Sequence, residues 1–383
     1  MPEQTLRAPR IEIIDGLRGY AILAIIFGHI YVRNTNILIP WGYHGIWLHG
    51  LKLSTFTFFT NFHEAVPLFF ILSGFVLFLP FALGIRKMEN RQDATAFYLR
   101  RARRLLPLYL INIFLFATMV KVDTLPRDTV KNLFFLLTFL FPFSSSLQQP
   151  TYNPVLWSLG VEAWFSLLMP LIIVCIRRYG FGKVMLTFIA FALILSFWHT
   201  FQPMSTYFWH TNGVGVRLRD FVFGMFLAHL CATRQLSVHG WKWLVTGTLI
   251  VSVSFLFSDA FWMKLVPAQL GAFTNLTVPL GFSLIIYGTL SVRWSVFRFL
   301  LANWPIQLCG MMCYSLYVWH SPAIVLQPAT TLVRLIRYLF LVFTVSLFSY
   351  RFIEFGSVKD WRSLLPNRPG KANATEHLNI VSR

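Results

Sequence analysis

The composition of this chain is that of a protein embedded in a lipid bilayer. Of its 383 residues, 56% are hydrophobic and 12% are charged, whereas soluble domains carry about 25% charged residues. The net charge of +19 raises the alternative of nucleic-acid binding, because Lys and Arg can neutralise phosphates. The basic residues, however, lie in short segments between apolar stretches, which is the usual pattern of membrane proteins. We therefore expect membrane lipids, and not nucleic acid, as the surroundings of this chain.

Long apolar stretches recur along the sequence and predict helices that cross about 30 Å of hydrocarbon. The expected spans are residues 16–34, 65–85, 105–121, 155–176, 182–199, 214–232, 241–260, 268–291, 302–326 and 333–353. A further apolar stretch, 133–143, has a length more typical of re-entrant or interfacial segments. The predicted fold is all-α, a polytopic membrane bundle of about ten transmembrane helices.

The charges of the loops predict the orientation of the bundle. With the spans above, the basic residues of 86–104, 177–183 and 293–298 fall on the same side as both termini. Cytoplasmic loops carry an excess of Lys and Arg, so both termini are expected in the cytoplasm. Counting 133–143 as a span would place Arg177 and Arg178 outside.

A change of composition near the end of the chain predicts a domain boundary. Residues 1–355 are expected to form the membrane domain, and the polar residues 356–383 a disordered cytoplasmic tail. The four Cys lie within apolar segments without metal-ligand spacing, so no metal site is predicted.

Two ionisable residues share one face of the first expected span. Arg18 and His29 are eleven residues apart, a separation that returns to nearly the same face of a helix and places His29 about 16 Å deeper than Arg18. Charged or ionisable groups within a span are costly and are by default functional candidates. A lone buried His is also often structural, which is the alternative here.

Further ionisable residues are expected in the outer half of the bundle. His63 and Glu64 precede the second span, Glu162 lies one to two turns into the fourth, and His320 lies near the outer end of the ninth. His and carboxylate groups in a low-dielectric setting are what general acid–base catalysis requires. The alternative is a set of buried pairs that join helices.

Four arginines occur at the expected cytoplasmic start of the third span, in residues 100–104. Arg101 and Arg104 lie one turn apart on the same face of a helix. Because guanidinium groups match phosphate oxygens bidentately, this pair is a candidate site for a phosphorylated cytosolic donor. A topology signal with lipid-headgroup contacts explains the same charges.

Five sequence blocks, in order through nearly the whole chain, resemble the acyltransferase 3 family of membrane acyltransferases. They are Asp15-Gly16-Leu17-Arg18-Gly19 followed by His29, Pro67 to Phe75, Arg100 to Pro107, Leu156-Trp157-Ser158-Leu159-Gly160-Val161-Glu162, and Tyr314 to Pro322. These blocks also mark Asp15, Ser73, Trp157 and Tyr317 as polar candidates, beside His63, Glu64 and His320. The chain departs from the family pattern after Glu354, which lacks the Arg-Pro that often follows, so no role is predicted for Glu354.

The resemblance implies transfer of an acetyl or related acyl group, usually from coenzyme A thioesters, to hydroxyls of carbohydrates. The expected donor is acetyl-CoA or another acyl-CoA, with no bound cofactor. The expected acceptor is a carbohydrate such as a surface polysaccharide, a lipo-oligosaccharide or a lipid-linked glycan. The expected location is the cytoplasmic (inner) membrane of a bacterium.

These implications assign a role to each main candidate. Arg101 and Arg104, together with Arg18, are expected to bind the donor phosphates. His29 is expected to act as general base on the acceptor hydroxyl, with Glu162 orienting it or balancing its charge. A covalent acyl intermediate on His29 or Ser73 is an alternative to direct transfer.

Two other classes of membrane protein remain as alternatives to an enzyme. In a transporter, the charged residues within spans would form a proton or substrate path. In a non-catalytic membrane subunit, Arg18, His29 and Glu162 would be structural. Thioester hydrolysis or glycan acylation by the purified protein separates an enzyme from both.

Overall fold

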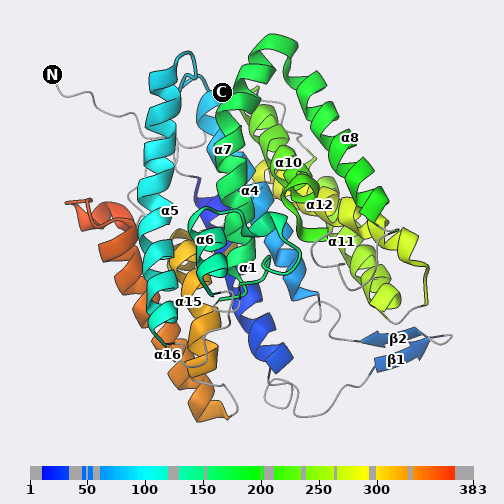
Figure 1. The fold of residues 1–383 in the computed structure, drawn as a ribbon. Helices are drawn as coiled ribbons and strands as arrows, with labels where there is room; N and C mark the ends of the chain where they lie inside the picture. The colour runs from blue at the N-terminus through cyan, green and yellow to red at the C-terminus, as the bar shows by residue number, and fades with distance from the viewer. Residues whose placement is uncertain are drawn as a thin grey trace.

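The structure, a computed structural model, is a bundle of long helices (Figure 1). It describes residues 11–33, 45–48, 51–54, 61–119, 129–150, 153–199, 201, 211–233, 239–262, 265–292, 299–326 and 331–366. Its α-helices are α1 (Glu12–Arg33), α4 (Ala65–Ala82), α5 (Arg91–Met119), α6 (Thr129–Leu137), α7 (Leu156–Tyr179), α8 (Phe181–His199), α10 (Val214–Ala232), α11 (Gly240–Trp262), α12 (Ala268–Ser291), α14 (Trp304–Met311), α15 (Cys313–Leu326) and α16 (Leu332–Phe348). Shorter helical turns are η1 (Phe62–Glu64), η3 (Phe141–Phe143), η5 (Ser349–Glu354) and η6 (Trp361–Leu364).

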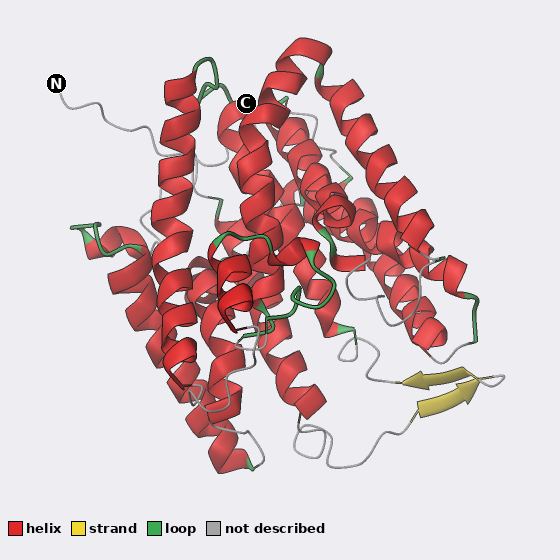
Figure 2. Ribbon diagram, in the orientation of Figure 1, coloured by secondary structure: helices red, strands yellow, loops and turns green. Residues whose placement is uncertain are grey.

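One small hairpin departs from the predicted all-α fold. Strands β1 (Gly45–Leu48) and β2 (Leu51–Ser54) pair antiparallel, with Gly45 opposite Ser54 and Leu48 opposite Leu51. Figure 2 shows the hairpin at one end of the bundle, outside the helical core. Strands of four residues give no apolar period long enough to be recognised in a sequence.

The helices are those of an integral membrane protein. Seven of the described helices are long and apolar enough to cross a membrane. The other expected spans also form helices, but α5 and α10 carry several charged residues. The remaining expected span, 302–326, is divided into α14 and α15 at Met312. The total of about ten spans therefore remains a prediction.

The ambiguous stretch 133–143 forms two short pieces instead of one long helix. Helix α6 has nine residues, a length of about 14 Å, and the three-residue turn η3 follows it. A helix of this length cannot cross about 30 Å of hydrocarbon.

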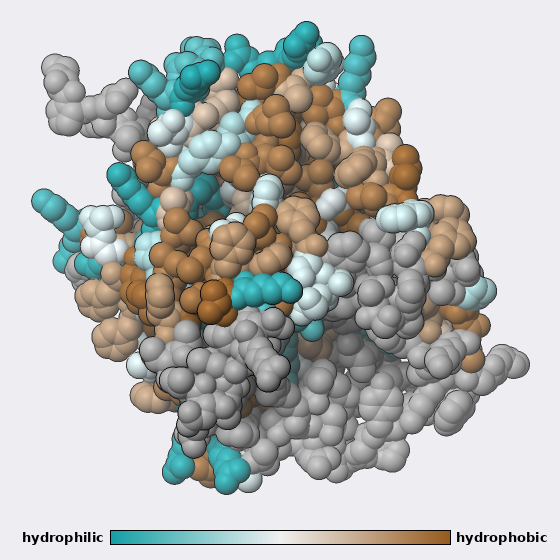
Figure 3. All heavy atoms as spheres, in the orientation of Figure 1, coloured by the Kyte–Doolittle hydropathy of each residue, from teal (hydrophilic) through white to brown (hydrophobic). Residues whose placement is uncertain are grey.

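The connections between helices group basic residues at one end of the bundle. The α4–α5 connection and the α7–α8 turn lie together at the top of Figure 1. Gly180 forms the second turn with φ of 89°, a conformation that glycine adopts without a steric penalty. Arg177 donates to the carbonyl oxygen of Met88 at 2.8 Å. Figure 3 shows hydrophilic residues at this end above a broad hydrophobic zone, as expected for a face at the membrane boundary.

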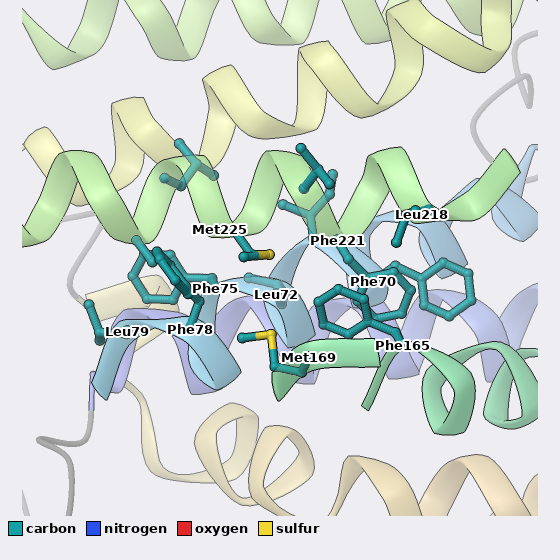
Figure 4. Packing of buried hydrophobic residues seen from close by; sticks show 14 of the residues in the cluster. Phe70, Leu72, Phe75, Phe78, Leu79, Phe165, Met169, Leu218, Phe221 and Met225 are labelled. Carbon is teal, nitrogen blue, oxygen red and sulfur yellow. The ribbon is translucent and has the colours of Figure 1, made fainter. Parts of the chain in front are cut away.

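The main hydrophobic core lies where α4 crosses α10. Gly74 and Gly224 permit this close approach, because a Cβ at either would meet the backbone of the other helix. The ring of Phe221 stacks between those of Phe70, at 4.8 Å, and Phe165, at 3.9 Å, measured between centroids. Figure 4 shows these rings with Met169 and Met225 filling the space among α4, α7 and α10.

The first residues of the predicted disordered tail pack against the bundle. Residues 356–366 are described and include η6. Leu364 is buried, and its carbonyl oxygen accepts a hydrogen bond from the hydroxyl of Tyr350 at 3.1 Å. The predicted boundary after residue 355 is therefore too early. Residues 367–383 lie outside the described residues.

Cysteine accessibility tests on which side of the membrane each loop lies. In a variant without the native Cys, single Cys at Lys87 and Tyr179 should react with an impermeant thiol reagent only after permeabilisation. Cys at Gln149, beyond α6, should react in intact cells, because it lies on the opposite side of the predicted topology. Labelling of position 179 in intact cells would show that α7 has the opposite orientation to the predicted one.

Candidate active site

A cavity with both polar and apolar walls lies inside the helical bundle, between α1, α4, α5, α7 and α15. Its volume is about 80 Å³, which is room for a few water molecules or one small group. Its polar lining residues are Arg18, Ser73, Arg101, Arg104, Ser158, Glu162, Cys313, Tyr314 and Tyr317. The sequence blocks from five separate parts of the chain therefore meet at one place.

Arg101 and Glu162 form an ion pair across α5 and α7. One guanidinium nitrogen of Arg101 lies 2.6 Å from Glu162 Oε1, and its Nε donates to Ser166 Oγ at 3.1 Å. The two side chains are 13% and 23% exposed. Arg101 is ten residues beyond the start of α5, about 15 Å along the helix. Its side chain therefore points into the bundle, and the placement of the four arginines at the cytoplasmic start of a span stays a prediction.

Arg104 is paired with a carboxylate from the other end of the chain. Its Nε lies 3.2 Å from Oε1 of Glu354, whose side chain is completely buried in η5. Ser315 donates from Oγ to Oε2 of Glu354 at 3.2 Å. Glu354, to which the sequence assigned no role, therefore holds one of the two arginines of the Arg-x-x-Arg element. The loss of Arg-Pro after it does not prevent this contact.

The cavity carries more positive than negative charge. The guanidinium groups of Arg101 and Arg104 each have a carboxylate partner. Arg18 lines the same cavity, and the described residues provide no hydrogen bond or ion pair for it. A cation without a counter-ion at a water-sized cavity favours binding of an anion.

His29 and His320 meet next to this cavity. Their ring centroids are 5.0 Å apart, and the ring of Phe62 lies 4.9 Å from that of His29. Gly28 makes room for Phe62, because a Cβ at this position would overlap the Phe62 ring. The structure thus brings together two histidines from α1 and α15 that the sequence indicated separately.

Tyr317 connects the histidine pair with the cavity. Its ring lines the cavity and lies 5.5 Å from the ring of His320. Its hydroxyl donates to the carbonyl oxygen of Val155 at 2.9 Å and accepts from Ser158 Oγ at 2.7 Å. These two hydrogen bonds fix the Tyr317 ring between the arginines and the histidines.

Six of the predicted site residues line the cavity, and the others lie elsewhere. The six are Arg18, Ser73, Arg101, Arg104, Glu162 and Tyr317. Trp157 is a core residue, 8% exposed and 6.1 Å from the Phe70 ring. Asp15 lies in the first turn of α1 and Glu64 ends η1, whereas the side chain of His63 lies outside the described part. Glu162 is paired with Arg101, so the structure gives it a different partner from the predicted His29.

A second buried charge cluster lies in α10 and was not recognised in the sequence. Asp220 lies 3.3 Å from both Arg217 and Arg219, and its carboxylate is completely buried. Arg217 also donates to Asn212 at 2.6 Å, and Arg219 to Ser196 of α8 at 2.9 Å. Asp220 thus offsets part of the charge of the two arginines, and the contact with Ser196 joins α10 to α8. Its position away from the lining of the cavity indicates a structural role.

The fold and this site define a class of protein: an integral membrane protein with a cavity inside its helical bundle that adjoins a pair of histidines. The chain belongs to the acyltransferase 3 family, since the family model, described as an acyltransferase domain, matches residues 11–358. No solved structure matches the chain.

Bacterial O-acetyltransferases are similar to this chain over most of its length. O-acetyltransferase OatA of Staphylococcus aureus is 26% identical over 372 residues, covering 89% of this chain and 56% of the relative. Peptidoglycan O-acetyltransferase OatA of Listeria monocytogenes is 24% identical, with coverages of 90% and 55%. The putative peptidoglycan O-acetyltransferase YrhL of Bacillus subtilis is 24% identical, with coverages of 82% and 48%. The chain thus spans about half the length of these relatives.

The ion pair between Arg101 and Glu162 predicts that a single substitution lowers the stability of the protein more than the double substitution does. Glu162→Gln leaves a guanidinium without its counter-ion and should cost up to about 3–5 kcal/mol of stability. The neutral double variant Arg101→Gln/Glu162→Gln should recover most of this loss. Thermal unfolding in detergent measures both. Glu89→Gln is the matched control, because its pair with Lys87 is exposed, at 51% and 71%, and should change stability by less than about 1 kcal/mol. Equal effects of the 162 and 89 substitutions would contradict the pairing.

Proposed function

We propose that this protein is an O-acyltransferase that moves an acetyl or related acyl group from an acyl-CoA to a hydroxyl of a carbohydrate. The observation that carries the proposal is the cavity lined by Arg18, Arg101 and Arg104, next to a histidine pair. Family membership supports acyl transfer. The names of the relatives support O-acetylation of a glycan.

The donor binds through its phosphates and acyl thioester. Arg18 supplies a guanidinium that has no counter-ion among the described residues, and Arg101 and Arg104 supply two more that their carboxylates hold in place. A volume of about 80 Å³ fits a phosphate or a short acyl group, and not a whole coenzyme A. The nucleotide end of the donor therefore lies toward the cytoplasmic end of α5, and the thioester enters the bundle.

His29 acts as general base in direct transfer. Its imidazole takes the proton of the acceptor hydroxyl, whose oxygen bonds to the acyl carbon of the thioester. The carbon–sulfur bond breaks, and the thiolate of coenzyme A takes the proton back from His29. Such positioned proton transfer contributes about 10²- to 10⁴-fold in rate. Glu162 acts through Arg101 in this scheme, since its carboxylate is bonded to that guanidinium.

The acceptor belongs to the class of bacterial surface glycans. Two relatives are named for peptidoglycan, which makes amino-sugar polymers the first acceptor to test. The bundle would then lie in the cytoplasmic membrane of a bacterium, with the donor on the inner side and the acceptor on the outer side. The acyl group would then pass through the cavity from the donor on the inner side to the acceptor on the outer side.

Arg18→Gln tests the donor site without breaking an ion pair. With acetyl-CoA and soluble peptidoglycan fragments, the donor KM should rise about 10- to 100-fold, because a charge-assisted contact is worth about 1.5–3 kcal/mol. The acceptor KM should stay within about twofold. Released thiol measures the rate. Arg178→Gln, an exposed arginine at the end of α7, is the control. An unchanged donor KM in the Arg18 variant would show that the donor phosphates bind at another site.

His29→Ala tests the base. At saturating donor and acceptor, kcat should fall at least about 100-fold while the protein still inserts and elutes as wild type from a size-exclusion column. Residual turnover near the wild-type rate would remove His29 from the mechanism. Loss of the folded species would instead support a structural role for this residue.

A further inference from the structure

The histidine pair contains one ring that the mechanism above does not use. The planes of His29 and His320 are inclined at 61° with centroids 5.0 Å apart. His320 is 0% exposed, whereas His29 is partly exposed. A substrate therefore reaches His29 first, and His320 lies behind it.

The helix backbone determines which nitrogen of each ring carries the hydrogen. Nδ1 of His29 lies 2.9 Å from the carbonyl oxygen of Ile25, and Nδ1 of His320 lies 2.7 Å from that of Tyr317. A carbonyl oxygen only accepts hydrogen bonds, so Nδ1 is the protonated nitrogen in both rings. In the neutral form, Nε2 is then the basic nitrogen of each.

Nε2 of His320 is a buried acceptor that the described part of the chain leaves without a donor. The nearby Tyr317 hydroxyl cannot serve, because it already donates to the carbonyl oxygen of Val155. A buried acceptor without a donor destabilises the fold. The nearest ring that can gain a proton during the reaction is that of His29.

We propose that His320 is a positioning residue for acyl transfer, whose Nε2 lone pair stabilises the positive charge that His29 acquires. The inference rests on the proposed function. The acceptor O–H bond breaks and an N–H bond forms on His29. That proton leaves with the thiol after the carbon–sulfur bond breaks. His320 gains and loses no proton, and its effect is large because its own ring is completely buried.

Two substitutions separate this role from simple packing. His320→Leu removes the lone pair, and His320→Gln keeps an acceptor oxygen on a neutral side chain. With acetyl-CoA and soluble peptidoglycan fragments, kcat of the Leu variant should fall about 10- to 100-fold with both KM values within about twofold, within the range of proton-transfer effects. The fall in log kcat of the Gln variant should be less than half of the fall in log kcat of the Leu variant.

Tyr338→Phe is the matched control for a general disturbance of the packing around His320, since Tyr338 lies in α16 and contacts α15. The Tyr338 hydroxyl donates to the main-chain oxygen of His320 at 3.2 Å. Its removal should leave kcat within about twofold, while size-exclusion profiles monitor folding in every variant. Wild-type kcat in the Leu variant would overturn the inference, as would equal losses in the Leu and Gln variants with raised KM. Absence of transfer by the wild-type protein would overturn the proposed function, and this inference with it.

Discussion

Burial of charge in an apolar bundle is the constraint on which the site depends. A guanidinium group within the bundle is stabilised where carboxylates and hydroxyls contact it. Arg101 is held by Glu162 and Ser166, and Arg104 by Glu354. Since these partners come from different helices, α5 must pack against α7 and η5 in one register. The same contacts that secure the fold therefore aim two cations at the cavity.

The histidine pair obeys a different rule, because it is positioned by main-chain carbonyls and aromatic rings. His29 and His320 each bond to the carbonyl of their own helix, and Phe62 and Tyr317 pack beside them. The bundle thus separates a region of ion-paired arginines from a pair of histidines, with Tyr317 between the two.

The sequence could predict the features that depend on local spacing. The separation of eleven residues placed Arg18 and His29 on one helix, and the apolar stretches located most of the long helices. It could not predict that α5 begins at Arg91, because a hydropathy pattern excludes the charged residues that precede the expected span. The sequence therefore did not show that α5 continues for ten residues before Arg101, and it paired Glu162 with His29, whereas the structure pairs Glu162 with Arg101. Contacts such as that of Arg104 with Glu354 join residues 250 positions apart, which no local pattern reports.

That separation of 250 positions also bears on how the protein is made. A ribosome adds about 5–20 residues each second, so Arg104 is synthesised roughly 12 to 50 seconds before its counter-ion. During this interval α5 must wait in the translocation machinery, at the membrane surface or beside another acidic group. The cavity is consequently among the last parts of the molecule to assemble, and a nascent chain released before η5 would carry an arginine that the membrane interior cannot accommodate.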